Sequence, residues 1–355
     1  MPELLTSESN FDVIHYSLKK VSHIKESANG KSLILWILLV ICLFTFEGIS
    51  EAKENEEHSG VLSAQSMKLS GYTQVNYTRG DDGKEGFRIR QARVGLKGNI
   101  FKKINYKLQI DAVLTPILLD AQIEINLSPH INFTFGQFKV PFSIENLVSG
   151  SDLDTISRSQ TVEKLCPGRD IGAKGRDLGA AVKGEFSRIK YILAIFNGSG
   201  INKADYNDQK DIAGRIVFSP GSFLVFGLSH YNGRYSPSPK APFEKKNRTG
   251  IDVFIDYRRL SLKGEYILAR DENAERHGWY IQGGYYIVKR KIQTMMKYDS
   301  LYTKGIQGDR IDTATFGLNL LFADKTKFQI NYEYRKRRLD KNSSHVILAQ
   351  LQAGF

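Results

Sequence analysis

Hydrophobic and polar residues alternate along most of the chain from Met67 to Phe355, and there is almost no helical periodicity. In residues 104–112, Ile, Tyr, Leu, Ile and Ala fall on one face, while Asn, Lys, Gln and Asp fall on the other. Residues 119–127 and 328–335 repeat this pattern. A period of two is typical of β-strands whose two faces meet different surroundings. The sequence therefore predicts an all-β protein from Met67 onward.

Sixteen segments carry the strand pattern. They are residues 67–78, 86–98, 103–114, 117–127, 131–138, 177–186, 188–197, 211–219, 222–232, 249–258, 260–270, 277–288, 290–299, 311–323, 326–336 and 345–355. Apart from the short connection at Thr115-Pro116, the connections are alternately tight and longer. This arrangement predicts a transmembrane antiparallel up-and-down barrel of about 16 strands, with turns at its periplasmic end and loops outside.

Three features favour a membrane barrel over a soluble sandwich, which also alternates. The strands are about 9 to 12 residues long, the length that a tilted strand needs to cross a bilayer. Their charged faces continue from strand to strand, which suits a water-filled lumen. Aromatic residues lie near strand ends, as interfacial girdles require: Tyr72, Tyr77, Phe101, Phe186, Tyr257, Trp279, Phe322 and Tyr334. The alternating last strand ends on Phe355, as in bacterial outer-membrane barrels.

The first 52 residues predict export. An apolar run at 33–46 follows Lys31 and is followed by Ser50-Glu-Ala52, which together are typical of a secretory signal peptide. The alternative is a single membrane anchor, for which the run is short. We therefore expect a signal peptide with an extended n-region at 1–52, a flexible periplasmic lead-in at 53–66 and the barrel at 67–355.

Composition alone suggests a basic soluble protein, with a mean hydropathy of −0.32 and a net charge of +12. In a barrel, that hydropathy averages a lipid-facing surface with a wet lumen. Removing residues 1–52 takes away six acids and four lysines, so the net charge rises to +14. The basic run 335–338 could suggest nucleic acid, but here it enters an external loop, where it is solvated or meets lipopolysaccharide phosphates. We expect no nucleic-acid partner.

No enzyme, metal or cofactor site is expected. Two cysteines exclude a disulfide scaffold, and Cys166 is the only one left after cleavage. The seven histidines are scattered without ligand spacing.

The second strand carries the clearest candidate chemistry. Strict alternation in residues 87–97 would place its apolar residues on both faces, but one β-bulge near Gln91 repairs the pattern. The bulge puts four cations on the lumen side: Arg88, Arg90, Arg93 and Lys97. Such a ladder favours anions over cations. The alternative is that lumenal acids neutralise it, namely Asp111, Asp120 and Glu124.

The third external connection, residues 139–176, is by far the longest and is expected to fold inward and narrow the lumen. It contains Lys139, Arg158 and Arg169 among its six basic residues, against five acids. Lys107 lies on the polar face of the third strand and is a further candidate for the pore lining.

Several motifs resemble the phosphate-selective porin O/P family. They are the run 136–145, Arg158, Pro167-Gly-Arg-Asp-Ile-Gly172, Phe196-Asn-Gly198 and the strand 87–98. The resemblance implies a sixteen-stranded, usually trimeric outer-membrane channel for phosphate or other small anions. It implies ladder roles for Arg88, Arg90 and Arg93, and constriction roles for Lys139 and Arg158.

Two hypotheses follow. The first is a passive anion-preferring porin whose partners are small anions, outer-membrane lipid and further copies of itself in a homotrimer. The second is a surface binding or adhesion protein with an occluded lumen. The loops are modest in length for an adhesin, so we favour the porin.

Overall fold

The computed structural model describes residues 66–355 apart from residues 82, 84, 206–208, 237–242, 273, 304–307 and 340–341. The expected signal peptide and nearly all of the expected lead-in lie outside the described residues. Among the described residues, no helix is long and apolar enough to cross a membrane.

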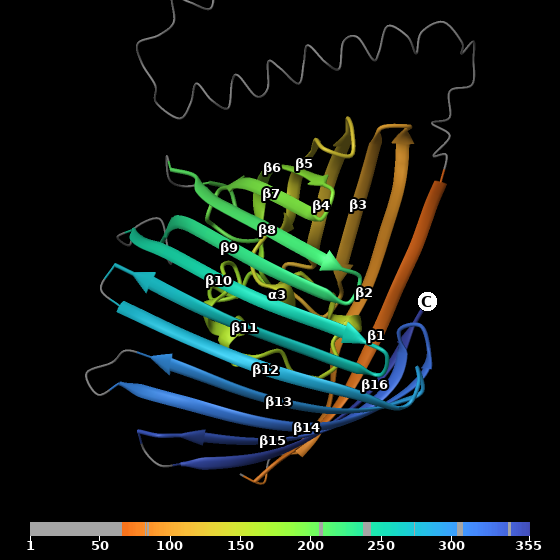
Figure 1. Cartoon of the computed structure of the whole chain (residues 1–355), viewed down its shortest axis with the longest axis vertical. Coiled ribbons are helices and arrows are strands. Elements are labelled where there is room, and N and C mark those ends of the chain that lie inside the picture. The colour runs from red at the N-terminus through yellow and green to blue at the C-terminus, as the bar shows by residue number, and fades with distance from the viewer. Residues whose placement is uncertain are drawn as a thin grey trace, which may run out of the picture. The chain divides into compact units, whose positions relative to one another are not determined.

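Sixteen antiparallel strands form one closed barrel, which confirms the predicted fold and strand count (Figure 1). The strands are β1 Ser66–Gly80, β2 Glu85–Phe101, β3 Ile104–Asp111, β4 Leu118–Asn126, β5 Asn132–Lys139, β6 Arg176–Phe186, β7 Ile189–Phe196, β8 Asp211–Gly221, β9 Leu224–Tyr235, β10 Glu244–Tyr257, β11 Leu260–Asp271, β12 Ala274–Val288, β13 Ile292–Thr303, β14 Asp309–Ala323, β15 Thr326–Arg337 and β16 Ser343–Gly354. Each strand pairs with its neighbours in sequence, and β1 pairs with β16.

The C-terminal strand closes the barrel. β16 pairs with β1 from Gly354 opposite Tyr72 to Val346 opposite Gly80. Beyond this ladder, the backbones of Gly71 and Phe355 exchange two hydrogen bonds of 3.0 Å. A Cβ on Gly71 would lie 2.6 Å from the Phe355 ring, so glycine makes room for the terminal aromatic side chain. The last residue is therefore part of the seam.

The strands are apolar outside and polar inside, the reverse of a soluble domain. On β9, Phe226 and Leu228 are exposed on the outer face, while Ser229 and Tyr231 are buried on the inner face. On β15, Ile330 faces outward and Asn331 is fully buried inside. Because unpaired polar groups are costly in hydrocarbon, this arrangement matches a barrel in a bilayer.

The bulge lies where the sequence predicts it. Gln74 pairs with Gln91 and Val75 pairs with Ile89, so Arg90 is the additional residue on β2. The Arg90 side chain nevertheless points into the barrel, where its Nη1 lies 3.2 Å from Oε1 of Gln74.

Two sequence expectations are corrected. The chain contains short helices between β5 and β6, namely α3 Ile144–Leu147, the 3-10 turn η2 Gly150–Asp152 and α4 Gln160–Leu165. Each is too short to show helical periodicity, which explains why the sequence pattern missed it. Tyr72 does not belong to an interfacial girdle, because it points inward and is 5% exposed. Its hydroxyl donates a hydrogen bond to Gln91.

Candidate functional site

Residues 140–175, which we call the loop segment, lie inside the barrel and carry α3, η2 and α4 (Figure 1). Serine side chains begin both α-helices, because Ser143 accepts from the Asn146 N–H and Ser159 accepts from the Val162 N–H. The segment connects two lumenal surfaces of different chemistry, which are described in turn.

Polar side chains from β13–β16 and β1 hold the middle of the loop segment through its backbone. Asn319 and Gln329 donate to the Asp154 carbonyl at 2.8 and 3.0 Å. Asn331 accepts the Ile156 N–H at 2.7 Å. The other contacts of this kind come from Gln74 to Gly150, Gln352 to Ser151, Lys327 to Leu153, and Lys297 to Ser157. We call this set of lumenal side chains the anchoring wall.

An apolar cluster fills the space between the loop segment and β6–β13. Phe142, Val162 and Leu165 are fully buried there against inward-facing residues such as Ile267. Small residues on the strands let the segment approach closely. A Cβ on Gly278 would lie 2.5 Å from Oγ1 of Thr161, and one on Gly250 would lie 3.0 Å from the Phe142 ring. This part of the lumen is a packed core.

On its other side the loop segment leaves a cavity of about 260 Å³ against β2 and β5. Eight cationic side chains line the cavity, and one carboxylate does: Arg88, Arg90, Arg93, Lys139, Arg158, Arg169, Lys174 and Arg176, with Glu163. The structure thus brings together six of the eight residues that the sequence indicates, from two strands and a loop.

Carboxylates neutralise part of this cationic set. Arg93 pairs with Asp111 at 2.9 Å. Asp120 pairs with Arg176 and with Lys107, each at 2.7 Å. The third predicted acid, Glu124, pairs with Lys183 at 2.7 Å, and neither side chain lines the cavity.

Four cavity cations have no such partner. Within the part of the chain that the structure describes, no carboxylate forms an ion pair with Arg88, Arg90, Lys139 or Lys174. Counting Glu163, Asp111 and Asp120 against the eight cations leaves a formal excess of five positive charges. The acids therefore neutralise Arg93, whereas Arg88 and Arg90 of the predicted ladder remain charged.

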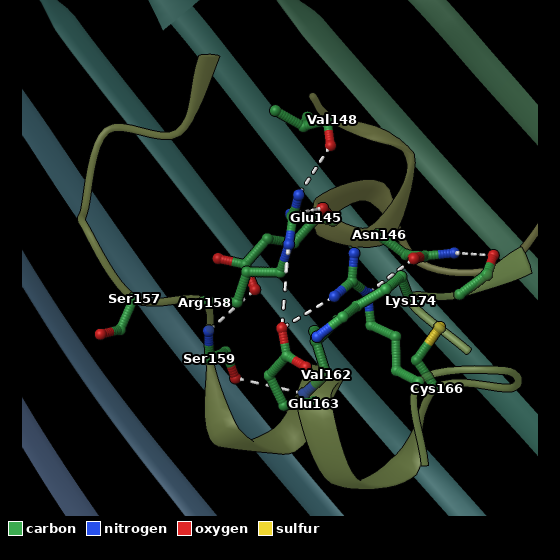
Figure 2. Close-up of polar contacts among 12 residues, drawn as sticks. Glu145, Asn146, Val148, Ser157, Arg158, Ser159, Val162, Glu163, Cys166 and Lys174 are labelled. Atoms are coloured by element: carbon green, nitrogen blue, oxygen red, sulfur yellow. Dashed lines mark hydrogen bonds and ion pairs between the residues drawn. The ribbon is translucent and has the colours of Figure 1, made fainter. Parts of the chain in front are cut away.

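Arg158 and Lys139 have a structural task as well as a charge. Arg158 donates to the carbonyls of Glu145 and Val148, and the second of these bonds is 2.9 Å long (Figure 2). Lys139 donates to the carbonyls of Leu147 and Val148, both at 2.9 Å. These carbonyls lie at the end of α3 and have no N–H donor within the helix. Both cations thus fix the end of α3 at the cavity wall.

Glu163 is the one carboxylate among the cavity residues. Its Oε1 lies 2.8 Å from Nη1 of Arg169. The same oxygen lies 3.9 Å from Nε of Arg158, and Figure 2 shows Arg158 beside Glu163. The Glu163 side chain is 43% exposed, whereas both arginine side chains are nearly buried. Burial and the neighbouring Arg169 lower the pKa of Arg158 to about 9, which still leaves it charged at neutral pH. Cations are crowded here with little compensation.

Lys97 and Lys107 lie outside the cavity. They are directly opposite each other on β2 and β3, and Lys68 of β1 is opposite Lys97. Like charges at opposed positions are destabilising, and the ion pair of Lys107 with Asp120 offsets part of this repulsion. It extends the basic surface from the cavity toward the turn end of the barrel.

The sequence did not single out Lys174, Arg176 or Glu163 as site residues. Lys174 follows the predicted motif and has a left-handed backbone, φ 52°, which no local pattern indicates. Arg176 begins β6, and Glu163 lies in α4, so their place in the cavity depends on how the loop segment folds back. Cys166 is fully buried, and burial raises the pKa of its thiol, so it is not a reactive group. The described residues hold no group of three or more His, Cys, Asp and Glu placed for a metal.

Comparison with known proteins connects this geometry to a family. The family model for phosphate-selective porin O and P matches residues 68–245, half of the chain. A search of curated proteins finds no match to this sequence.

Several solved structures share the fold. An anion-selective porin from Comamonas acidovorans superposes with a TM-score of 0.65 and 12% identity, covering 82% of this chain and 99% of that one. The outer-membrane channel DcaP of Acinetobacter baumannii superposes with a TM-score of 0.61 and 12% identity, covering 84% of this chain and 100% of that one. The trimer form of OmpT from Vibrio cholerae superposes with a TM-score of 0.59 and 9% identity, covering 81% of this chain and 99% of that one. At these identities the likeness establishes the fold alone.

Proposed function

Because this chain belongs to the phosphate-selective porin O and P family of outer-membrane porins, we propose that it is a passive diffusion channel for small anions. Family and fold point to a channel rather than an enzyme. The observation that carries the anion preference is the cavity, where eight cations face one carboxylate beside the loop segment. Fixed positive charge at a constriction lowers the barrier for anions and raises it for cations.

Arg88 and Arg90 are the ladder residues that most affect selectivity, since they face the cavity without a carboxylate partner. Lys139, Arg158 and Arg169 form the constriction on the loop side, while Lys97 and Lys107 draw anions toward the turn-end mouth. Phosphate or an anion of similar size fits this set, because guanidinium groups bind phosphate oxygens with strong charge-assisted hydrogen bonds.

Planar-bilayer recording tests the proposal. In a KCl gradient, the purified protein should show a reversal potential of the sign given by chloride permeation, and added phosphate should reduce the chloride current. Arg88→Gln/Arg90→Gln should lower the anion-to-cation permeability ratio by roughly tenfold, because two uncompensated charges leave the constriction. Arg310→Gln/Arg338→Gln makes the same charge change on the outer face of the barrel and should leave the ratio unchanged.

A cation-selective reversal potential, or an unaltered ratio in the Arg88/Arg90 variant, would contradict the proposal. Loss of all conductance together with loop-dependent ligand binding would instead support a surface binding protein with an occluded lumen.

The proposal includes assembly and export. We propose a homotrimer, supported by family membership and by the trimeric form of the similarly folded OmpT. Native mass spectrometry of the purified protein should give three copies. We also propose that residues 1–52 are a signal peptide and that residues 53–66 lead into the barrel. N-terminal sequencing of the protein from outer membranes should then begin at Lys53.

A further inference from the structure

The outer face of β13–β15 changes in chemistry toward the loop end of the barrel. On β13 the outward residues run from Met296 through Tyr298 to Tyr302, and on β15 from Ile330 through Tyr332 and Tyr334 to Lys336. Met296 and Ile330 are well exposed, as expected for lipid-facing positions. The cross-strand pairs place Phe316 opposite Tyr332 and Arg310 opposite Tyr302. An aliphatic band is thus followed by an aromatic band and then by basic residues.

Two arginines at the basic end share one carboxylate. Nε of Arg310 donates to Oδ1 of Asp312 at 2.7 Å, and Nε of Arg338 donates to Oδ2 at 3.3 Å. Asp312 also accepts from Ser300 Oγ at 2.8 Å, so the carboxylate is held by three donors. We call Arg310, Asp312 and Arg338 the arginine clamp. It fixes two guanidinium groups side by side on the outside of the barrel.

Two tyrosine side chains of the aromatic band contact Arg310 of the clamp. Arg310 lies over the Tyr302 ring, 5.0 Å from its centroid, and its Nη2 donates to the Tyr298 hydroxyl at 3.4 Å. Among the described residues, Nη1 of Arg310 and both terminal nitrogens of Arg338 have no hydrogen-bond partner. With Lys336 opposite Asp312 on β15, the patch carries three cations and one acid. It therefore retains a net charge of +2 and free donors directly above an aromatic band.

We propose that the arginine clamp binds a phosphate group of lipopolysaccharide in the outer leaflet, with the aromatic band against its acyl-chain and sugar region. The aromatic band marks the level of the membrane interface, so the clamp lies at the depth of the lipid headgroups. Two adjacent guanidiniums suit a phosphomonoester, which carries up to two charges and three terminal oxygens, better than the singly charged diester of a phospholipid. The inference rests on the proposed orientation, with the longer loops at the cell surface.

The test uses the full barrel refolded without lipopolysaccharide and native mass spectrometry with synthetic diphosphoryl lipid A. The wild-type protein should bind this probe more tightly than it binds phosphatidylglycerol. Arg310→Gln/Arg338→Gln should weaken lipid A binding by at least about tenfold, because two charge-assisted contacts are lost. Arg310→Lys/Arg338→Lys keeps the charge but not the planar guanidinium. Its affinity for lipid A should lie between that of the wild type and that of the glutamine variant.

Arg258→Gln/Arg290→Gln is the matched control. Arg258 lies over the Tyr257 ring at 5.1 Å, which reproduces the contact of Arg310 with Tyr302 at the turn end of the barrel. This control should bind lipid A like the wild type. Unchanged lipid A binding in the glutamine variant of the clamp would overturn the proposal, as would equal affinity of the wild type for phosphatidylglycerol. A variant that loses lipid A because it no longer forms oligomers would identify the patch as a subunit interface and also overturn it.

Measuring ion selectivity in the same preparations distinguishes a failure of the lipid A proposal from a failure of the proposed channel function. The clamp variants should retain wild-type conductance and anion preference, which also shows that they are folded. A protein that binds lipid A but is not anion-selective would contradict the porin proposal alone.

Discussion

The loop segment has two sides, and they meet the barrel through different chemistry. Toward β6–β16 it contacts the apolar cluster and the anchoring wall, where mainly amides and lysines bind its backbone. Toward β2 and β5 it borders a water-accessible cavity with a formal excess of five positive charges. The first side is a packed interior, and the second is the candidate path for solutes.

The difference between the two sides explains how charge can remain uncompensated in the cavity. Ion pairs across the constriction would hold the loop segment but would also neutralise the groups that attract a solute. Here, packing, backbone hydrogen bonds and the ion pairs of Asp170 with Lys246 and Arg248 fix the segment away from the cavity. Cations of the cavity such as Arg88 and Arg90 therefore stay free of carboxylates. The packed side thus fixes the loop segment, and this allows the cations on the cavity side to remain uncompensated.

The largest effect is expected from breaking the packed side. In Gly278→Val, the new side chain would collide with Thr161, whose Oγ1 lies 2.5 Å from the position of an added Cβ. Overpacking of this kind costs about 1–3 kcal/mol, so α4 should leave its site. Single-channel conductance should rise roughly twofold or more, and anion preference should fall, since the cavity loses one wall. Gly264→Val is the control, because its nearest neighbours lie 3.6 Å away; equal conductance in both variants would contradict the anchoring role of this packing.

A second comparison separates paired from unpaired cations in the ladder. Arg93→Gln leaves Asp111, whose side chain is 1% exposed, without its partner, and should lower the free energy of unfolding by about 3–5 kcal/mol. Arg90→Gln removes a cation without a carboxylate partner and should change stability by less than about 1 kcal/mol. Urea unfolding of the refolded proteins, followed by tryptophan fluorescence, measures both. Equal stability losses would show that the Arg93 pair is no more important to the fold than Arg90.

The sequence predicted the barrel well because its signal is local. Alternation, turn residues and strand length are properties of neighbouring residues, and they located all sixteen strands to within a few residues, apart from the start of β10. The bulge at Arg90 was also predictable, since lipid-facing arginines near the midplane would cost about 2–4 kcal/mol each.

The cavity was only partly predictable because it depends on tertiary contacts. Alternation along the second strand predicts the lumenal position of Arg88, and the family-like run 136–145 predicts the role of Lys139. The contribution of Glu163 follows from the path of α4 across the lumen, which is set by contacts with β10, β13 and β14 far away in sequence. The pairing of Lys107 with Asp120 is likewise a matter of strand register between β3 and β4.

A third prediction sharpens the charged side. Glu163→Gln removes the carboxylate that contacts Arg169 and Arg158, so both guanidiniums become more available to a solute. Phosphate should block the chloride current at a roughly threefold to tenfold lower concentration. Glu185→Gln, whose partner Lys190 lies at 3.2 Å outside the cavity, is the control and should change nothing. Weaker block in Glu163→Gln would instead assign Glu163 the role of orienting the arginines.

The smallest effect concerns the anchoring wall and tests whether the two sides respond differently to salt. Gln329→Ala removes the amide that donates to the carbonyls of Leu153 and Asp154. Each carbonyl keeps a second donor, Lys327 for Leu153 and Asn319 for Asp154, so the variant loses only hydrogen bonds worth about 0.5–1.5 kcal/mol each. This stretch should therefore fluctuate more, with a noisier open-channel current at unchanged mean conductance. Because no charge is lost, the added noise should be equal in 0.1 M and 1 M KCl, whereas the selectivity loss of Arg88→Gln/Arg90→Gln should shrink at high salt.

Gln122→Ala is the control for the anchoring wall, because its amide donates to Glu124 on the same strand and not to the loop segment. It should leave the current noise unchanged at both salt concentrations. If noise in Gln329→Ala instead fell steeply with salt, the contacts of the anchoring wall would be governed by charge, and the division of the lumen into a packed side and a charged side would not hold. A salt-independent rise confined to Gln329→Ala would mean that uncharged amide contacts, in addition to those of Lys297 and Lys327, position the loop segment beside the cavity.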